Sequence, residues 1–425
     1  FSKEAITFTC SPVKLFLKVL FLLFLLLVCQ LSVGSDEQEL HDRLLVLDSH
    51  IDTPIRLGMP GFNIMERHDA STDYSQVDLP RMVDGGLDGG FWAIFTSQGD
   101  LSADGYAKAK RIAHSRANAI LQLEVDYPDY FTIAKNAADA KIIVGKGRKV
   151  VYLSIENAYP LGLDVSNLRE FYDLGVRMLG LVHTRNNQFA DSSTDPDGPK
   201  WDGLSPLGIE LGQEANKLGM IIDGSHAHDL ALEQMISHSS TPVVLSHSGS
   251  KAIFDHSRNV PDDLLIKLKQ SGGLIHMNSL GGYLQPIHVS PGRKMEFGKF
   301  VEDINMLEAA GSPMSYEEFR TRRGDIDLTH PSEEAHFFDY MSHFTHVLDL
   351  LGPSYVGVGA DWDGGGGVIG MKDISDLRKV TEHLLHSGYT EFDLENIWGG
   401  NLLRLLRKVE RRKADLGKSR SLIDK

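Results

Sequence analysis

The chain has 425 residues with a formal net charge of −15, and 42% of its residues are hydrophobic. This length suits one large domain, and the apolar content is that of a soluble globular protein. Because nucleic-acid phosphates require basic grooves, the acidic balance argues against nucleic acid as a partner.

Residues 1–35 have the pattern of a secretory signal peptide. Lysines precede the apolar run 19–29, and a valine and a serine stand at positions −3 and −1 of a cleavage site before Asp36. We therefore expect an exported protein, periplasmic or extracellular, with residues 36–425 as its folded body. Two alternatives stay open, an uncleaved anchor helix and a lipoprotein cut before Cys29. In both, the N-terminus attaches the protein to a membrane.

The sequence contains two cysteines, Cys10 and Cys29, and both lie in this N-terminal segment. The body therefore has no disulfide and no thiolate ligand for a metal. A body of this size buries enough of its chain to fold without such cross-links.

Eight short apolar runs along the body predict its strands. They are rich in Val, Ile and Leu, and amphipathic stretches such as 107–121 separate them. Continuous apolar runs are typical of strands buried on both faces of a parallel sheet. Their alternation with helices predicts a (β/α)8 TIM-like barrel. The runs are 44–47, 91–95, 150–155, 178–182, 220–222, 243–245, 274–277 and 356–358.

Three other segments of the sequence predict further features of the fold. Pro261, Asp262 and Asp263 indicate the first turn of a helix, whose N-terminal end favours negative charge. The stretch 281–331 is long, charged and weakly periodic, and we interpret it as an insertion after the seventh strand that forms a lid or wall. The basic tail from Arg404 onward is typical of a solvated end of C-terminal helices.

Side chains that can bind metal or titrate follow six of the eight runs. In a barrel, the carboxyl ends of the strands converge on one face, where active sites form. A lone histidine or a single His-x-Asp is more often a surface or capping residue, so the joint occurrence carries the hypothesis. The residues, in strand order, are His50 and Asp52, Glu156, His183, His226, His247 and Asp361.

Five of these side chains suit a pair of zinc ions. His50 and Asp52 are two residues apart, so on an extended strand they point the same way and can hold one ion. Glu156 has two oxygens that can bridge to a second ion, which His226 and His247 can complete. Two such ions would share a hydroxide that is nucleophilic at neutral pH.

The order of several motifs resembles the membrane (renal) dipeptidase family, a family of zinc hydrolases on a metal-dependent barrel. The resemblance covers nearly all of 40–410, and the motifs together are highly specific. One departure follows the bridging glutamate, where the family usually has Gly-Gly and this chain has Asn157-Ala158. The motifs are DSHID at 48–52, GLSPLG at 203–208, DGSH at 223–226, PVVLSHS at 242–248, DHSRNVPDD at 255–263 and VGVGADWDG at 356–364.

The resemblance implies a metallo-dipeptidase with two Zn2+ ions per chain. His50, Asp52 and Glu156 would hold one ion, and Glu156, His226 and His247 the other. This assignment gives the bridging role to the glutamate.

The resemblance also implies roles for three further residues. His183 would polarise the scissile carbonyl and stabilise the oxyanion. Asp361 would orient the water, take its proton and pass it to the leaving amine. Arg258 would pair with the free C-terminal carboxylate of the substrate, for which its planar guanidinium is well shaped.

The implied substrates are dipeptides, including those with a C-terminal D-residue, and the family also suggests a homodimer. A same-fold metal hydrolase acting on a lactam, a lactone or an N-acyl amino acid is the first alternative. A non-enzymatic binding protein that keeps the barrel is the second. Metal analysis and a panel of dipeptides beside lactones would distinguish them.

Overall fold

The computed structural model describes residues 37–423. The predicted signal peptide at 1–35, with its cleavage, anchor and lipidation alternatives, therefore lies outside the described residues. Between residues 37 and 423, no helix is both long enough and apolar enough to cross a membrane.

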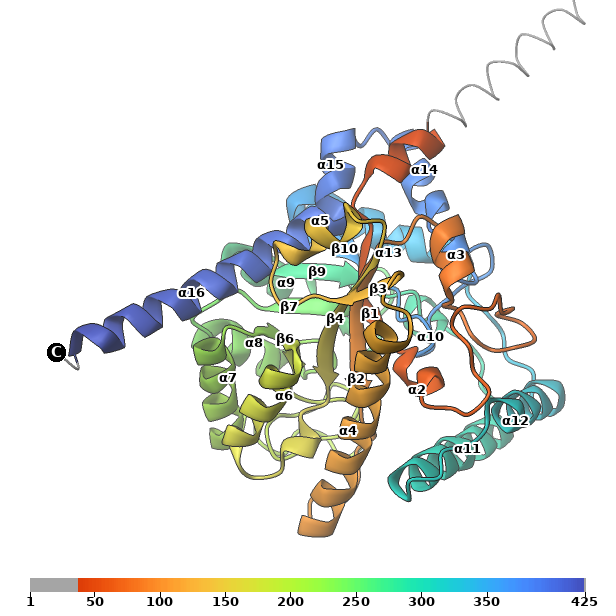
Figure 1. The fold of residues 1–425 in the computed structure, drawn as a ribbon, viewed down its shortest axis with the longest axis horizontal. Helices are drawn as coiled ribbons and strands as arrows, with labels where there is room; N and C mark the ends of the chain where they lie inside the picture. The colour runs from red at the N-terminus through yellow and green to blue at the C-terminus, as the bar shows by residue number, and fades with distance from the viewer. Residues whose placement is uncertain (1–36, 424–425) are drawn as a thin grey trace, which may run out of the picture.

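Eight parallel strands form a barrel at the centre of the described chain, which confirms the predicted fold (Figure 1). A parallel bridge between Ile51 and Trp362 closes the ring, and Asp52 N–H donates to the Trp362 carbonyl at 2.8 Å. Two short strands lie off the ring, β3 (Phe131–Ile133) beside β4 and β8 (Asn259–Val260) beside β7. The barrel strands, in spatial order, are β1 (Leu47–Ile51), β2 (Gly89–Phe95), β4 (Lys149–Glu156), β5 (Val176–Gly180), β6 (Ile221–Asp223), β7 (Val244–Ser250), β9 (Leu274–Met277) and β10 (Val356–Val358).

The first strand differs from its sequence prediction. The apolar run at 44–47 ends where β1 begins, and β1 continues through polar residues. These polar residues can be buried because hydrogen bonds within the barrel satisfy their polar groups. Asp48 accepts from the backbone N–H groups of His50 (2.8 Å) and Ala360 (3.1 Å). Ser49 Oγ donates to the Ser246 carbonyl at 2.5 Å. Hydrogen bonds across the barrel thus extend the strand beyond its hydrophobic segment.

Helices surround the strands on the outside of the barrel (Figure 1). The predicted helix at 107–121 lies within α4, and α9 begins at Asp262 as expected from its proline and acidic residues. The helices outside the inserted segment are α2 (Pro54–Leu57), α3 (Leu79–Asp84), α4 (Ala103–Asp126), α5 (Asp139–Val144), α6 (Leu168–Leu174), α7 (Pro206–Leu218), α8 (Asp229–His238), α9 (Asp262–Gln270), α13 (Phe337–Leu351), α14 (Arg378–His386), α15 (Glu391–Glu395) and α16 (Asn401–Ile423).

Local sequence signals fix the bounds of α7. Ser205 accepts from Gly208 N–H as its N-cap, and Pro206 occupies the first turn, where a missing N–H costs nothing. The helix ends at Gly219, whose φ of +73° is a left-handed conformation that glycine adopts without strain. Such capping sets the length of the helix between β5 and β6.

The amino end of the barrel is closed by α16. Its leucines join a buried cluster with residues from the starts of the strands, among them Leu47, Phe91 and Val244. Apolar packing therefore closes this end, and the carboxyl end of the barrel remains available for polar groups. The α16 side chains in the cluster are Leu402, Leu403, Leu405, Leu406 and Val409.

The segment after β9, the seventh strand of the ring, is a helical insertion. It comprises α10 (Gly281–Leu284), α11 (Pro291–Ala309) and α12 (Tyr316–Thr329), and the last two form a hairpin beside the barrel (Figure 1). The hairpin has its own small core, in which Phe300, Tyr316 and Phe319 are buried. The insertion predicted at 281–331 is therefore present and folded.

Candidate metal centre

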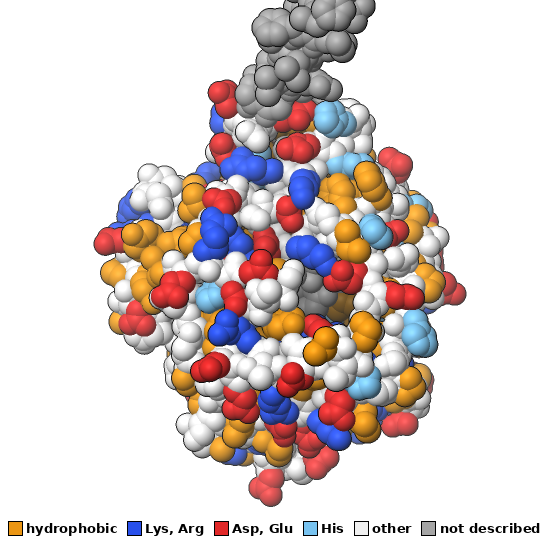
Figure 2. Space-filling model, turned by 90° about the vertical axis from the view of Figure 1, so that its right-hand side faces the viewer, with side chains coloured by type: hydrophobic (Ala, Val, Ile, Leu, Met, Phe, Trp, Pro, Cys, Tyr) orange, Lys and Arg blue, Asp and Glu red, His pale blue; other side chains and the backbone are white. Residues whose placement is uncertain are grey.

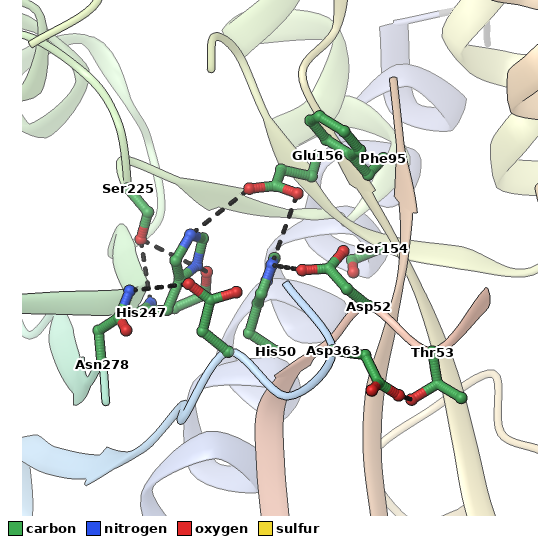
Figure 3. Close-up of polar contacts among 12 residues, drawn as sticks. His50, Asp52, Thr53, Phe95, Ser154, Glu156, Ser225, His247, Asn278 and Asp363 are labelled. Carbon is green, nitrogen blue, oxygen red and sulfur yellow. Dashed lines mark hydrogen bonds and ion pairs between the residues drawn. The ribbon is translucent and has the colours of Figure 1, made fainter. Parts of the chain in front are cut away.

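The structure brings all seven predicted strand-end residues together at the carboxyl end of the barrel. Glu156 lies at the centre of the cluster, and its two oxygens face different partners (Figure 3). Glu156 Oε2 lies 3.5 Å from His50 Nε2. Glu156 Oε1 lies 2.9 Å from His226 Nε2, 3.5 Å from His247 Nε2 and 3.6 Å from His183 Nε2.

The side chains form three overlapping sets that could each hold a metal ion. Within each set the ligand atoms lie within 4.8 Å of one another. His50 and Asp52 belong to the same set, with Nε2 and Oδ2 3.2 Å apart, as expected for neighbours two residues apart on a strand. The sets are His50, Glu156 and His247; Glu156, His183 and His226; and His50, Asp52 and Asp361.

Hydrogen bonding indicates that the cluster fits a metal. Both ring nitrogens of His50 and Oδ1 of Asp52 are buried without a hydrogen bond, although His50 Nε2 lies within ion-pair distance of Asp52 and Glu156. The Nε2 atoms of His226 and His247 lie only 2.8 Å apart. Buried polar atoms are rarely left unpaired, and imidazole nitrogens with carboxylate oxygens are the ligands that zinc prefers.

The charges of the cluster lead to the same conclusion. Burial raises the pKa of Glu156 to about 7 and that of Asp361 to about 6. Two of the three carboxyl groups in the site are thus costly to ionise in a dry environment. Cations between them would offset that cost, and a purely structural cluster would not need three carboxyl groups so close together.

Buried hydrogen bonds behind the cluster orient His247. Ser246 Oγ donates to Asp223 Oδ2 at 2.5 Å, so this hydroxyl accepts from His247 Nδ1 at 2.8 Å. The remaining His247 nitrogen, Nε2, then faces the cluster with its lone pair. Such a second contact is what fixes the tautomer of a metal-binding histidine. The strand-end pattern predicted no role for Asp223 or Ser246, although both lie in the DGSH and PVVLSHS motifs.

Several backbone conformations at the cluster are unusual. His226 and Asp361 both have φ of +67°, and Asp363 has φ of +65°. Non-glycine residues with positive φ are uncommon and concentrate at functional sites. Asn157, which follows Glu156, has φ of +70°, and asparagine is among the few residues other than glycine that tolerate this conformation. Its Nδ2 donates to the Thr96 carbonyl at 2.9 Å, which holds the loop after Glu156.

His183 and Asp361 lie at the edge of the cluster and face the cavity. Burial, and then the nearby guanidinium of Arg258, lower the pKa of His183 to about 3, so the ring is neutral at physiological pH. Asp361 Oδ2 accepts from Asn278 Nδ2 at 3.1 Å. This contact holds one carboxylate oxygen and leaves the other toward the cluster.

Arg258 lies under the cluster and is only 3% exposed. Its Nε donates to His226 Nδ1 (3.1 Å), Nη1 to Ser248 Oγ (3.0 Å) and Nη2 to the His247 carbonyl (2.9 Å). A guanidinium has five N–H donors, so two remain for another acceptor. Arg258 therefore supports His226 and His247, in addition to its predicted role in binding a substrate carboxylate.

A cavity of about 290 Å³ opens onto the cluster. Asp52, Glu156, His183, His226 and Asp361 form its inner end. The opposite wall comes from the inserted hairpin, which agrees with the interpretation of 281–331 as a lid or wall. The residues of the hairpin that form this wall are apolar and stand at helical spacing along the chain. They are Phe297, Phe300, Val301 and Ile304.

Comparison with known proteins agrees with this geometry. The sequence model of the membrane dipeptidase family (Peptidase family M19) matches residues 35–420. Dipeptidase aclJ of Aspergillus oryzae is 31% identical over 342 residues, which cover 79% of this chain and 71% of the relative. An uncharacterized dipeptidase of Schizosaccharomyces pombe is 28% identical over 385 residues, covering 88% of this chain and 82% of that one.

Two solved structures have the same fold. The probable dipeptidase PvdM from Pseudomonas aeruginosa superposes with a TM-score of 0.75 at 29% identity, covering 90% of this chain and 99% of its own. A metallo peptidase from Rhodobacter sphaeroides, liganded with a phosphinate mimic of the dipeptide L-Ala-D-Ala, has a TM-score of 0.66 at 23% identity and covers 86% and 99%.

Fold and site together define a metallohydrolase built on a (β/α)8 barrel. The chain belongs to the membrane dipeptidase family and is a metallo-dipeptidase. The family, fold and enzyme class predicted from the sequence are thereby confirmed. Hydrolysis of dipeptides is the reaction of this family, and its metal dependence agrees with the histidine and carboxylate sets around Glu156.

Proposed function

We propose that this chain is a dinuclear zinc dipeptidase that hydrolyses dipeptides with a free C-terminal carboxylate, including those with a C-terminal D-residue. The observation that carries the proposal is the position of Glu156, whose two oxygens face His50 on one side and His226 with His247 on the other. A carboxylate shared in this way is suited to bridging two ions.

His50, Asp52 and Glu156 would hold one zinc ion, and Glu156, His226 and His247 the other. Bound zinc supplies Lewis acidity, which lowers the pKa of water and polarises a carbonyl group. The ligands come from four different strand ends, so only the folded barrel presents the whole set.

The remaining chemistry falls to His183 and Asp361. His183 is neutral and can donate one N–H to the carbonyl oxygen on which negative charge develops. Asp361 holds one oxygen in its bond from Asn278, and the other, Oδ1, can accept a proton from the attacking water. The same oxygen then delivers that proton to the leaving amine.

Arg258 would bind the C-terminal carboxylate with its two remaining N–H groups. The Arg258→Ala variant should raise KM for dipeptides about 10-fold or more, because a charge-assisted hydrogen bond to the substrate is lost. The zinc content of the variant is measured together with its KM, because Arg258 also contacts the proposed zinc ligand His226. An equal loss on substrates that lack a carboxylate would contradict the clamp.

The stereochemical part of the proposal is supported by the Rhodobacter enzyme, which binds a mimic of L-Ala-D-Ala. Metal analysis of the purified protein should give two zinc ions per chain. The zinc-loaded protein should hydrolyse L-Ala-D-Ala and L-Ala-L-Ala faster than lactones, lactams or N-acyl amino acids. Turnover confined to one of these other classes would overturn the proposal.

We further propose that residues 1–35 direct export and that 36–425 form one peptidase domain, active outside the cytoplasm as a homodimer. The support is the charge and apolar pattern of the N-terminal segment. N-terminal sequencing of the protein isolated from its host tests the cleavage before Asp36. Light scattering of the purified protein tests the dimer.

A further inference from the structure

The inserted helix α11 presents an apolar stripe to the cavity. Phe297, Val301 and Ile304 stand at positions i, i+4 and i+7, which lie on one face of a helix. All three line the cavity and are partly exposed, whereas Phe300 on the same side is buried in the hairpin core. The stripe is thus an apolar surface left open toward the metal cluster.

Apolar residues on the barrel side complete this part of the cavity. Ile55, Phe95 and Phe319 line it together with the α11 stripe. The outer surface of this face is different, since acidic and basic side chains are interspersed there (Figure 2). An apolar pocket inside a charged surface is typical of a site that recognises an uncharged group.

The charges in the lining are already paired. Among the described lining residues, each arginine outside the metal cluster contacts a carboxylate. Arg56 Nη2 lies 4.0 Å from Asp363 Oδ1, Arg116 Nη2 lies 2.9 Å from Glu308 Oε2, and Arg323 Nε lies 3.2 Å from Asp327 Oδ2. An acidic or basic side chain would have to compete with these pairs, whereas an apolar one would leave them undisturbed.

Polar contacts hold the apolar wall against the barrel. Asn305 Nδ2 donates to Ser97 Oγ at 2.9 Å, and the pair of Arg116 with Glu308 ties the same helix to α4. At the start of α12, Tyr316 N–H donates to the Pro60 carbonyl at 2.9 Å. The wall is therefore formed before a substrate arrives, which reduces the cost of binding.

The position of the wall relative to the catalytic groups identifies the substrate residue that it contacts. In the proposed function the metal cluster and Asp361 would lie at the amino end of the dipeptide, and Asp52 and Asp361 line the same cavity as the stripe. Arg258, the proposed clamp for the C-terminal carboxylate, does not line this cavity. It lies behind two of the lining residues, since its Nε donates to His226 and its guanidinium carbon is 5.6 Å from the ring centre of Tyr283.

We infer that the α11 stripe is a specificity pocket for the N-terminal residue of the dipeptide and selects a large apolar side chain. The inference rests on the proposed dipeptidase function and names its substrate class. Filling the pocket with a phenylalanine or leucine side chain removes apolar surface from water on both partners.

Binding of non-hydrolysable analogues tests the pocket without relying on turnover. Phosphinate mimics of Phe-Ala, Ala-Ala and Glu-Ala are titrated into the zinc-loaded protein by calorimetry. The Phe-Ala mimic should bind at least about 10-fold more tightly than the Ala-Ala mimic, since each buried methylene contributes several-fold. The Glu-Ala mimic should bind more weakly than the Phe-Ala mimic. Equal affinities, no binding of any mimic, or tightest binding of Glu-Ala would overturn the inference.

Substitutions on α11 test whether the residues of the stripe form the specificity pocket. Phe297→Ala should reduce the ratio of Phe-Ala to Ala-Ala affinity about 5-fold or more and leave the Ala-Ala affinity nearly unchanged. Ile304→Ala removes less volume and serves as a second variant if Phe297→Ala unfolds. Met295→Ala is the matched control, because Met295 lies on the same helix, is 55% exposed and does not line the cavity.

The outcomes separate the two proposals. Equal losses on both mimics in the Phe297→Ala variant would overturn the specificity pocket even if dipeptides are hydrolysed. Absence of dipeptide hydrolysis by a zinc-loaded protein that still prefers the Phe-Ala mimic would instead overturn the proposed reaction.

Discussion

At the scale of single residues, the site depends on a property of the barrel that brings distant side chains together. The carboxyl ends of parallel strands meet, so titratable residues that follow separate apolar runs become neighbours. The geometry around Glu156 agrees with this, although 106 residues separate it from His50 in sequence. The supporting bonds of Asp223, Ser246 and Asn278 could not be inferred in the same way, because any strand end carries similar polar residues.

The assignment of Asp361 can be tested with an isosteric change. Asp361→Asn should reduce kcat about 100-fold or more, because the amide cannot accept the proton from water. Zinc content should stay close to that of the wild type, since His50, Asp52 and Glu156 remain. Steady-state kinetics and metal analysis of the same preparation measure both. Full activity in this variant would refute the proton-transfer role.

Gly364 has a role that is visible only in three dimensions. A Cβ atom placed there would lie 2.1 Å from Asp52 Oδ2 and 2.2 Å from Asp361 Oδ1. Gly364→Ala should therefore displace both carboxylates, lower the zinc content and reduce kcat about 10-fold or more. Gly298→Ala on α11 is the control, because nothing lies within 4 Å of the corresponding Cβ. Unchanged zinc and kcat in Gly364→Ala would show that the carboxylates can move without consequence.

At the scale of secondary-structure elements, apolar runs identified the eight barrel strands in order. The first strand lies further along the chain than its apolar run, because Asp48 and Ser49 are stabilised by partners after β10 and in β7 that a local pattern does not contain. The insertion was located, but its apolar stripe faces a cavity rather than a core, and sequence periodicity does not distinguish the two.

The helix that closes the amino end of the barrel can be tested independently of catalysis. Leu406 on α16 is fully buried among residues from the strand starts. Leu406→Ala should lower the free energy of unfolding by about 2–5 kcal/mol, measured by chemical denaturation, because it leaves a cavity. Arg407→Ala, at an exposed position on the same helix, should change it little. KM should be unaffected in both variants, since the substrate cavity lies at the other end of the barrel, and a large change in KM would contradict this separation.

At the scale of the whole molecule, buried contacts connect segments that are distant in sequence. His41 lies near the start of the described chain, yet its Nδ1 lies 2.6 Å from Thr381 Oγ1 and its Nε2 lies 3.0 Å from the Gly85 carbonyl. Its ring also meets Trp398 edge-on at a centroid distance of 5.4 Å. One neutral histidine therefore connects the N-terminal segment to the end of α3, to α14 and to the π-helical segment before α16.

This histidine makes stability depend on pH in a defined direction. Burial lowers the pKa of His41 from 6.5 to about 4, so the unfolded chain takes up a proton at a higher pH than the folded one. The neutral His41 ring therefore contributes about 3 kcal/mol to the free energy of unfolding. This contribution is complete above pH 6.5 and is lost as the pH falls from 6.5 to about 4. In the His41→Gln variant this part of the pH dependence should disappear. Chemical denaturation of the wild type and the variant at several pH values measures the difference between their free energies of unfolding. This difference should shrink toward pH 4. A constant difference across that range would contradict the burial of a neutral ring.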